Sequence, residues 1–453
     1  MGEKCKTIKN IMRGSRARIA HRSRCRLGRP SPTEMVDCTI SAVHVYPVKG
    51  CRGVRVQRAR VTTTGLEHDR AWCIVDLKGA VVPRCEAISQ QRMPALAKVD
   101  VKLSDDGQML SINAPGMPQL VVPTAVAAYN GPMIQVQSSG SNWWLGAQPC
   151  RQHTEGSAWF TEYLNRASSQ CPGKRNSGSS RSALFALCRS VAPGGLAMAS
   201  YPPILPLTER AASDPRFAGS AVHMADFAPF KLVNITSAEE IAKHGEIDSY
   251  PVESFRANLV VRTSKPWEEE TWARLAVRAK RADGTATAAA SRSAAAPVQL
   301  TLRKVLECPA CMAHCRDACS GEPLFPRDPQ LLLRVLKAAF PERIGRDAPW
   351  GMWATGATFG VYFSHGGAEG LTLSEGDQLV VVESCTRWGA LALRRRQASG
   401  LLLALPRLGL VLAFEMFRLL YALVVAVVVG SRHRGHADVR ARRDESERST
   451  SYR

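Results

Sequence analysis

The chain has 453 residues, 14 cysteines and a formal net charge of +21. Its length allows about two to three average domains. Most of the basic excess lies at the ends: residues 1–35 hold ten Lys or Arg and two Glu, and residues 394–453 hold twelve Arg and five acidic residues. The rest of the chain carries a net charge of only +6. This distribution indicates targeting or membrane-surface charge and argues against a nucleic-acid groove.

Residues 1–35 are Arg-rich and poor in acidic residues. This composition predicts an organelle transit segment or a disordered basic tail. The N-terminus lacks the apolar core of a secretory signal, so we expect reduced thiols. Clustered thiols then favour metal binding or catalysis over disulfides.

Several short segments alternate apolar and polar residues and end at turn residues. They are "TISAVHVYPVKG" from Thr39, "VRVQRARVTTTG" from Val54, "RAWCIVDLKG" from Arg70, "QMLSINAPG" from Gln108 and "MIQVQSSG" from Met133. Alternation of this kind predicts half-buried strands, and their spacing predicts a barrel or sandwich. Residues 166–222, rich in Ser, Gly, Ala and Pro, are expected to form a variable connector.

The second half predicts more strands and two helices. "SFRANLVV", "VQLTLRKVLEC" and "FGVYF" with its continuation to Ser384 are expected strands, and residues 276–298 a low-complexity insertion. "NITSAEEIAKHG" predicts a helix capped by Ser237, with Glu240 completing a capping box. "RDPQLLLRVLKAAFP" predicts a helix capped by Asp328, with Pro329 in its first turn and Pro341 ending it.

Residues 408–430 form the most apolar run of the chain. At about 1.5 Å per residue, 23 helical residues span a hydrocarbon core of roughly 30 Å. We expect a membrane helix within residues 400–431, followed by a basic tail over 432–453. The alternative is an amphipathic helix lying on a membrane or on the protein.

The segment "LECPACMAHCRDACSG" places Cys308, Cys311, Cys315 and Cys319 within a dozen residues. Four thiolates suit an iron–sulfur cluster or zinc, although the spacing matches neither common pattern. A single cysteine at the end of a strand could instead bind a metal that an organic cofactor carries. The spacing alone leaves all three interpretations open.

Read together, several segments resemble successive parts of MOSC proteins. "VYPVKGCRG" and "GLEHDRAWCIVD" resemble their N-terminal β-barrel domain. "DFAPFKLVNITSAEEI", "SFRANLVV", "WEEETW", "VLECPACMAHCRDACSGEP" and "LTLSEGDQLVVV" resemble the MOSC domain itself. The resemblance is strongest to the amidoxime-reducing component family. It implies a mostly-β (α+β) fold: an N-terminal β-barrel domain over 36–165 and a MOSC barrel with a few helices over 223–390.

The resemblance also implies a molybdenum cofactor, with Cys311 as the metal ligand and catalytic residue. Asp317 and Gly321 match a family turn. The implied cofactor-binding residues are Lys49, Gly50, Arg70, Arg256, Asn258, Pro309 and Ala310. Gly50 replaces a family serine, Ala257 a family proline, and Ala228 a polar residue. These departures leave cofactor affinity and substrate preference open.

The implied activity is molybdenum-dependent reduction of N-hydroxylated or N-oxide substrates. A cytochrome b-type haem protein and its flavin reductase are the implied electron donors. The implied location is a membrane, mitochondrial or plastid, with the cytoplasm as an alternative. The family also carries an association with pyridoxal phosphate. The alternative functions are cofactor sulfuration, in which Cys311 carries sulfur, and a non-enzymatic zinc or iron–sulfur membrane protein that uses Cys308–Cys319.

Overall fold

A computed structural model describes residues 37–77, 85–137, 147–169, 183–191, 196–197, 220–280, 298–340 and 357–384. All belong to one of the two units into which the chain divides, residues 1–390. They form mainly β-strands, so the prediction of a mostly-β fold is confirmed. The segments expected over 1–35, 400–431 and 432–453 lie outside the described residues.

A closed seven-stranded barrel forms the larger part of the fold. Its order is β16-β15-β19-β18-β17-β21-β1, and β1 pairs back onto β16. The strands are β1 (Asp37–Val45), β15 (Phe230–Asn234), β16 (Leu259–Val261), β17 (Trp272–Arg278), β18 (Val298–Pro309), β19 (Thr358–Ser364) and β21 (Gln378–Ser384). A short strand, β2 (Val54–Val56), extends the sheet beyond β1. Closure leaves no open edge between β16 and β1.

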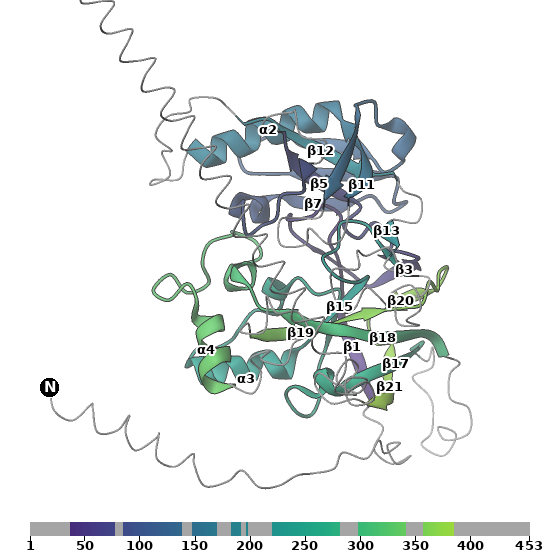
Figure 1. The fold of residues 1–453 in the computed structure, drawn as a ribbon, viewed down its shortest axis with the longest axis vertical. Coiled ribbons are helices and arrows are strands. Elements are labelled where there is room, and N and C mark those ends of the chain that lie inside the picture. Colours follow the sequence, from purple (N-terminus) through teal and green to yellow (C-terminus); the bar gives the residue numbers. More distant parts are fainter. Residues whose placement is uncertain are drawn as a thin grey trace, which may run out of the picture. The chain divides into compact units, whose positions relative to one another are not determined.

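Strand β1 comes from the beginning of the chain and completes a barrel built from residues after 229. Figure 1 shows β1, in purple, among the green strands β17 and β21. Its inward residues are Cys38 and Ile40, then Val43 and Val45. The alternation changes phase because a β-bulge shifts the β1–β16 register between Ile40 and Ala42.

The N-terminal part contains two further sheets. The first has the order β5-β12-β11-β10-β6, built from β5 (Trp72–Asp76), β6 (Cys85–Glu86), β10 (Met133–Gln137), β11 (Ala147–His153) and β12 (Phe185–Ser190). The second contains β7 (Asp100–Leu103), β8 (Met109–Asn113) and β9 (Leu120–Pro123). Helix α2 (Thr154–Ser169) buries Trp159, Phe160 and Leu164 in the core that these sheets share.

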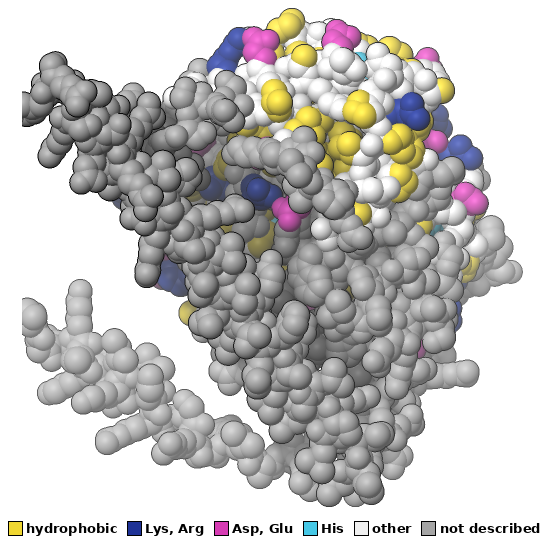
Figure 2. Space-filling view, turned by 45° about the horizontal axis from the view of Figure 1, so that its top comes forward, with side chains coloured by type: hydrophobic (Ala, Val, Ile, Leu, Met, Phe, Trp, Pro, Cys, Tyr) yellow, Lys and Arg dark blue, Asp and Glu magenta, His cyan; other side chains and the backbone are white. Residues whose placement is uncertain are grey.

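Smaller pairings complete the described strands. They are β20 (Thr372–Ser374) with β3 (Arg58–Thr62) and β4 (Gly65–Leu66), and β13 (Leu196–Ala197) with β14 (Ala221–Val222). In the view of Figure 2 the N-terminal part shows hydrophobic side chains between charged ones. Met109, Val121, Met133 and Leu184 are among its exposed large hydrophobic residues. Single exposed hydrophobic side chains of this kind are normal on a protein surface.

Both predicted helices of the second half are present, but their caps differ from the prediction. Helix α3 (Ile235–Gly245) is capped by Asn234, whose side chain accepts from Thr236 N, while Ser237 donates to buried Glu269. Helix α4 (Leu331–Ala339) begins after Gln330 without a side-chain cap, because Asp328 accepts from Arg334 instead. Pro341 lies outside the described residues.

Three local findings differ from the expected layout of the chain. Strand β1 pairs with the later barrel although it lies within 36–165. Strand β12 lies within the expected connector and pairs with β5 and β11. Residues 276–278 of the expected insertion are the end of β17, and Val298 begins β18. Within the described part of the chain no helix is long and apolar enough to cross a membrane; residues 408–430 are outside it.

Candidate functional site

The candidate site lies on the outer face of the barrel wall. Lys231 of β15 and Tyr362 of β19 are directly paired in register. Their neighbours Phe230, Leu232 and Phe363 fill the barrel interior. Because side chains alternate along a strand, Lys231 and Tyr362 point outward. The Lys231 ammonium lies 5.8 Å from the centre of the Tyr362 ring.

Tyr46, directly after β1, is the centre of a cationic cluster. Its ring lies 4.5 Å from the Arg70 guanidinium and 4.6 Å from that of Arg256. Its backbone N–H donates to Asp69 Oδ1 at 2.9 Å, and its hydroxyl donates to the Ala257 carbonyl at 3.3 Å. Burial raises the pKa of Tyr46 to about 12, so the hydroxyl stays a donor at neutral pH.

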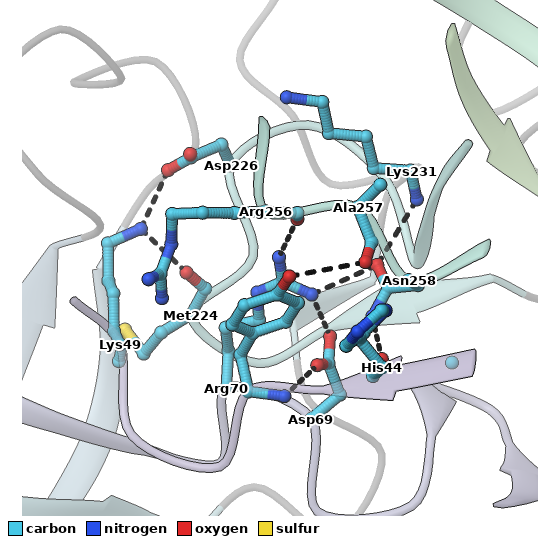
Figure 3. A network of polar contacts seen from close by, with 12 residues as sticks. His44, Lys49, Asp69, Arg70, Met224, Asp226, Lys231, Arg256, Ala257 and Asn258 are labelled. Carbon is cyan, nitrogen blue, oxygen red and sulfur yellow. Dashed lines mark hydrogen bonds and ion pairs between the residues drawn. The ribbon is translucent and has the colours of Figure 1, made fainter. Parts of the chain in front are cut away.

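Arg70 donates to three protein acceptors. Its guanidinium bonds to the buried Asp69 carboxylate, to Asn258 Oδ1 at 3.0 Å and to the Arg256 carbonyl at 3.0 Å. Asn258 is buried, and its amide donates to the His44 carbonyl at 3.2 Å. Arg70 and Asn258 therefore tie the turn before β5 to the segment before β16 (Figure 3).

Arg256 differs from Arg70 because no described carboxylate lies within ion-pair distance of it. Its Nη1 donates to Gln90 Oε1 at 3.3 Å. Desolvation lowers the pKa of Arg256, and the nearby Arg70 charge acts in the same direction. Both arginines have a left-handed backbone, with φ of 49° at Arg70 and 53° at Arg256. Non-glycine residues in this conformation are uncommon and cluster at functional sites.

Lys49 is buried and reaches across to the segment before β15. Its ammonium donates to the Met224 carbonyl at 2.8 Å and to Asp226 Oδ1 at 2.6 Å (Figure 3). The next residue, Gly50, has φ of +87°, and a Cβ there would meet Leu96 Cδ1 at 2.8 Å. Glycine therefore suits this turn mainly because of its positive φ, since the Leu96 side chain could move away from an added Cβ.

Cys311 caps a 3-10 turn, η9 (Met312–Cys315), at the end of β18. Its sulfur accepts the backbone N–H of His314, and its own N–H donates to His314 Nδ1 at 3.4 Å. Burial raises the pKa of Cys311, and the neighbouring Cys308 acts in the same direction. The backbone N–H groups of Ala313 and His314 and the Lys231 charge act in the opposite direction. The thiol form is therefore favoured in the protein without a metal, and a metal that binds Cys311 would displace its proton.

The other three thiols of the segment point elsewhere. Cys308 is buried, with its sulfur 3.7 Å from the Tyr362 hydroxyl. Cys315 packs in the hydrophobic cluster that contains the buried residues of α4, and Cys319 is exposed. Throughout the described ranges, no group of three or more His, Cys, Asp or Glu side chains is arranged to hold a metal ion. The arrangement offers no four-thiolate cage.

A tight turn follows η9. Asp317 Oδ1 accepts the backbone N–H groups of Cys319 and Ser320 at 3.0 and 2.6 Å. Gly321 has φ of +72°, and a Cβ there would lie 2.2 Å from the Pro94 carbonyl oxygen. This turn therefore packs directly against the N-terminal part of the protein.

Lys231 and His314 connect Cys311 to the cationic cluster, and the sequence analysis did not identify either as a site residue. The Lys231 ammonium donates to the Phe255 carbonyl at 2.6 Å and lies 3.0 Å from His314 Nε2. Both residues are buried, and burial lowers the pKa of His314 well below its ordinary value. A lysine inside the apolar stretch "FKLVN" was the available signal, because lysine is rarely buried without a specific role.

The structure places the sequence-predicted residues in two groups. Lys49, Arg70, Arg256 and Asn258 share one network around Tyr46, and Cys311 adjoins it through His314 and Lys231. Pro309 and Ala310 are engaged in the sheet instead. Pro309 pairs with Thr358, and the Ala310 N–H donates to the Ala357 carbonyl at 2.9 Å.

Comparisons with known proteins show what the chain is similar to. The family model described as "MOSC N-terminal beta barrel domain" matches residues 37–167. The chain carries a MOSC N-terminal β-barrel domain. It is 23% identical over 345 residues to "Mitochondrial amidoxime reducing component 2" of Bos taurus, with 75% of this chain and 82% of that protein covered. The similarity to this amidoxime reducing component thus spans most of the chain.

A second group of relatives is much longer than the matched region. The chain is 26% identical over 234 residues to "Molybdenum cofactor sulfurase" of Drosophila grimshawi, with 51% of this chain and 25% of that protein covered. The chain thus spans about a quarter of that relative. A structural match to the solved YUAD protein from Bacillus subtilis covers 77% of this chain and 96% of that protein. Its TM-score is 0.24 and the sequence identity is 6%. A likeness at that score supports no inference.

Proposed function

We propose that this chain is a molybdenum-cofactor-dependent oxidoreductase that reduces N-hydroxylated or N-oxide substrates. The observation that carries the proposal is the contact path from Cys311 through His314 and Lys231 to Asn258, which accepts from both the Lys231 backbone N–H and Arg70 of the cationic cluster around Tyr46. A phosphorylated pterin carrying a metal needs both parts: cations for the phosphate and a thiolate for the metal. Relatives named for amidoxime reduction and for the molybdenum cofactor support this choice.

The residues present fit such a cofactor. Arg256 is a desolvated cation with no described carboxylate within ion-pair distance. Its pKa stays lowered although Asp226 acts in the opposite direction, so an anionic ligand would relieve the cost of desolvation. Cys311 presents a half-buried thiol at a turn whose backbone N–H groups favour the thiolate. The bound cofactor would supply a metal that takes up and releases two electrons while the substrate oxygen leaves as water.

The remaining residues bind and position. Arg256 would contact the phosphate, and Cys311 would hold the metal. Arg70 and Asn258 would keep the Arg256 backbone in place, since both anchor its segment. The ion pair with Asp226 largely neutralises the charge of Lys49, so Lys49 would contribute hydrogen bonds more than net charge. Gly50, Pro309 and Ala310 would contribute to cofactor binding through backbone groups and not through side chains.

Two further parts of the proposal rest on relatives and on sequence. Electrons would come from a cytochrome b-type haem protein and its flavin reductase, as the resemblance implies. The apolar run 408–430 would attach the protein to a membrane, and the word "mitochondrial" in the relatives' names supports a mitochondrial one.

Metal and pterin analysis of the purified full-length protein tests the proposal. We expect molybdenum and pterin in equal amounts, together with reduction of an amidoxime by a chemical electron donor. Zinc or iron without pterin would support the metal-binding alternative and contradict the proposal.

A second candidate is cofactor sulfuration, which the match to molybdenum cofactor sulfurases favours. In that case Cys311 would carry sulfur as a persulfide. Intact-mass analysis separates the two functions, because a persulfide adds one sulfur atom to the protein and a dithiol reductant removes it.

A further inference from the structure

Gln90 is a buried polar residue at the edge of the cationic cluster. It follows β6, and only 4% of its surface is exposed. Its backbone nitrogen lies 3.4 Å from the position that a Cβ of Gly50 would take. Its Oε1 accepts from Arg256 Nη1 at 3.3 Å. Gln90 therefore lies between the Lys49–Gly50 turn and the Arg256 guanidinium.

The amide of Gln90 has a defined orientation. A guanidinium only donates hydrogen bonds, so the atom that faces Arg256 must be the amide oxygen. The amide nitrogen, Nε2, then points away from that contact. It has no hydrogen-bond partner among the described residues. A buried donor left without an acceptor is costly, and most such donors in proteins are met by a ligand or a bound water.

The groups that converge here have the same character. Arg256 offers guanidinium N–H groups and lacks a carboxylate partner among the described residues, and Gln90 adds a free amide N–H₂. Arg256 has no acceptor to offer, and the Gln90 amide oxygen already faces Arg256. The complementary ligand is rich in acceptor oxygens and negatively charged, as a phosphate ester is.

We propose that Gln90 is a ligand-binding residue, whose amide nitrogen donates to an oxygen of the anionic group that Arg256 binds. The inference rests on the proposed function and deepens it, because it makes residue 90 of the N-terminal domain part of the cofactor site. Gln90 would then join Lys49, Gly50 and Arg70 as a residue of the matched domain that takes part in the pocket.

The test compares Gln90→Met and Gln90→Glu in the full-length protein. Methionine keeps the length and removes both polar atoms. Glutamate keeps the acceptor for Arg256 but removes the donor and adds a repelling charge. The exposed neighbour provides matched controls, Gln91→Met and Gln91→Glu.

Two quantities are measured. Pterin content is determined after expression in a host that makes the cofactor. The Kd for inorganic phosphate is determined by thermal shift after expression in a host that does not. Loss of one hydrogen bond to a charged group should weaken phosphate binding roughly tenfold in Gln90→Met. Gln90→Glu should weaken it further while the unliganded protein melts no earlier, because the new carboxylate pairs with Arg256.

The outcomes separate this inference from the proposed function. One outcome is that Gln90→Met and Gln90→Glu keep the pterin content and phosphate Kd of the wild type, while Arg256→Ala loses pterin and phosphate binding. In that case the Gln90 amide nitrogen donates only to a water molecule. The inference about Gln90 is then wrong and the proposed function stands. If the wild-type protein neither holds pterin nor binds phosphate, both are wrong.

Discussion

The Arg70 guanidinium donates a 3.0 Å hydrogen bond to the backbone carbonyl of Arg256, although 186 residues separate them in the chain. The two side chains approach the Tyr46 ring at nearly equal distances, yet their charges are met differently. Arg70 is paired with a buried carboxylate, whereas no described carboxylate pairs with Arg256. This difference predicts different consequences for removing each one.

Arg256→Ala should lower the pterin content of the purified protein with little loss of stability, because it removes a half-buried cation that has no described carboxylate within ion-pair distance. Arg70→Ala should instead leave the buried Asp69 carboxylate without its ion-pair partner. The free energy of unfolding should then fall by about 3 kcal/mol. Urea denaturation and pterin analysis of both variants check this. The exposed Arg58→Ala is the control. Equal stability losses for the two variants would contradict the assignment.

Cys311→Ala should abolish molybdenum binding, whereas Cys319→Ala should retain it because that thiol is exposed and turned away. Cys315→Ala should also retain the metal. It should lose about 1 kcal/mol of stability, because its sulfur packs in the core with α4. Molybdenum is measured by mass spectrometry. Complete metal loss in Cys315→Ala would restore the multi-thiolate interpretation.

Gly321→Ala should destabilise the protein by more than about 2 kcal/mol, because its Cβ would lie 2.2 Å from the Pro94 carbonyl oxygen. Gly370→Ala is a matched control. Its φ of +79° is equally unfavourable for alanine, but no atom lies within 4 Å of the new Cβ. Thermal unfolding of both variants separates the close contact from the backbone conformation. Equal losses would show that the contact relaxes freely.

Stability should fall as the pH drops below 6.5, and His223 should account for part of the fall. Burial, with Arg189 and His68 nearby, lowers the pKa of His223 to about 4 from an ordinary value of 6.5. Between these values the unfolded chain binds a proton that the folded protein does not, so acid favours unfolding. The loss from His223 is about 2 kcal/mol at pH 5.

Urea denaturation at pH 7 and pH 5 measures this effect. His223→Gln cannot titrate and should show a smaller loss than the wild type over that interval. An unchanged pH dependence in His223→Gln would rule out its contribution.

Full-length protein should stay with membranes during alkaline carbonate extraction, because residues 408–430 are apolar enough to span a bilayer. Deleting residues 400–453 should release an active protein, since the last barrel strand, β21, ends at Ser384. Recovery of the full-length protein in the soluble fraction would favour a peripheral helix.

The sequence alone determined the local features of this protein. Alternation predicted β1, β5, β8 and β10, because the side-chain period of a strand is visible in any short window. The segment of the long strand β18 was also expected to be a strand, and capping residues and prolines predicted α3 and α4. The caps were wrong because Ser237 and Asp328 bond to distant or later side chains, Glu269 and Arg334. A cap depends on partners that periodicity does not reveal.

Only the tertiary structure decided which distant segments meet. Strand β1 finds its partners more than 200 residues later, in β16 and β21, and no local pattern specifies that pairing. The same closure brings Tyr46 between Arg70 and Arg256. It also leaves Lys231 beside His314, and Gln90 beside Arg256. Residue type and spacing indicate candidate ligands. Their hydrogen-bond partners, burial and charge balance depend on the tertiary structure, because long-range strand pairing fixes which side chains share one face of the barrel.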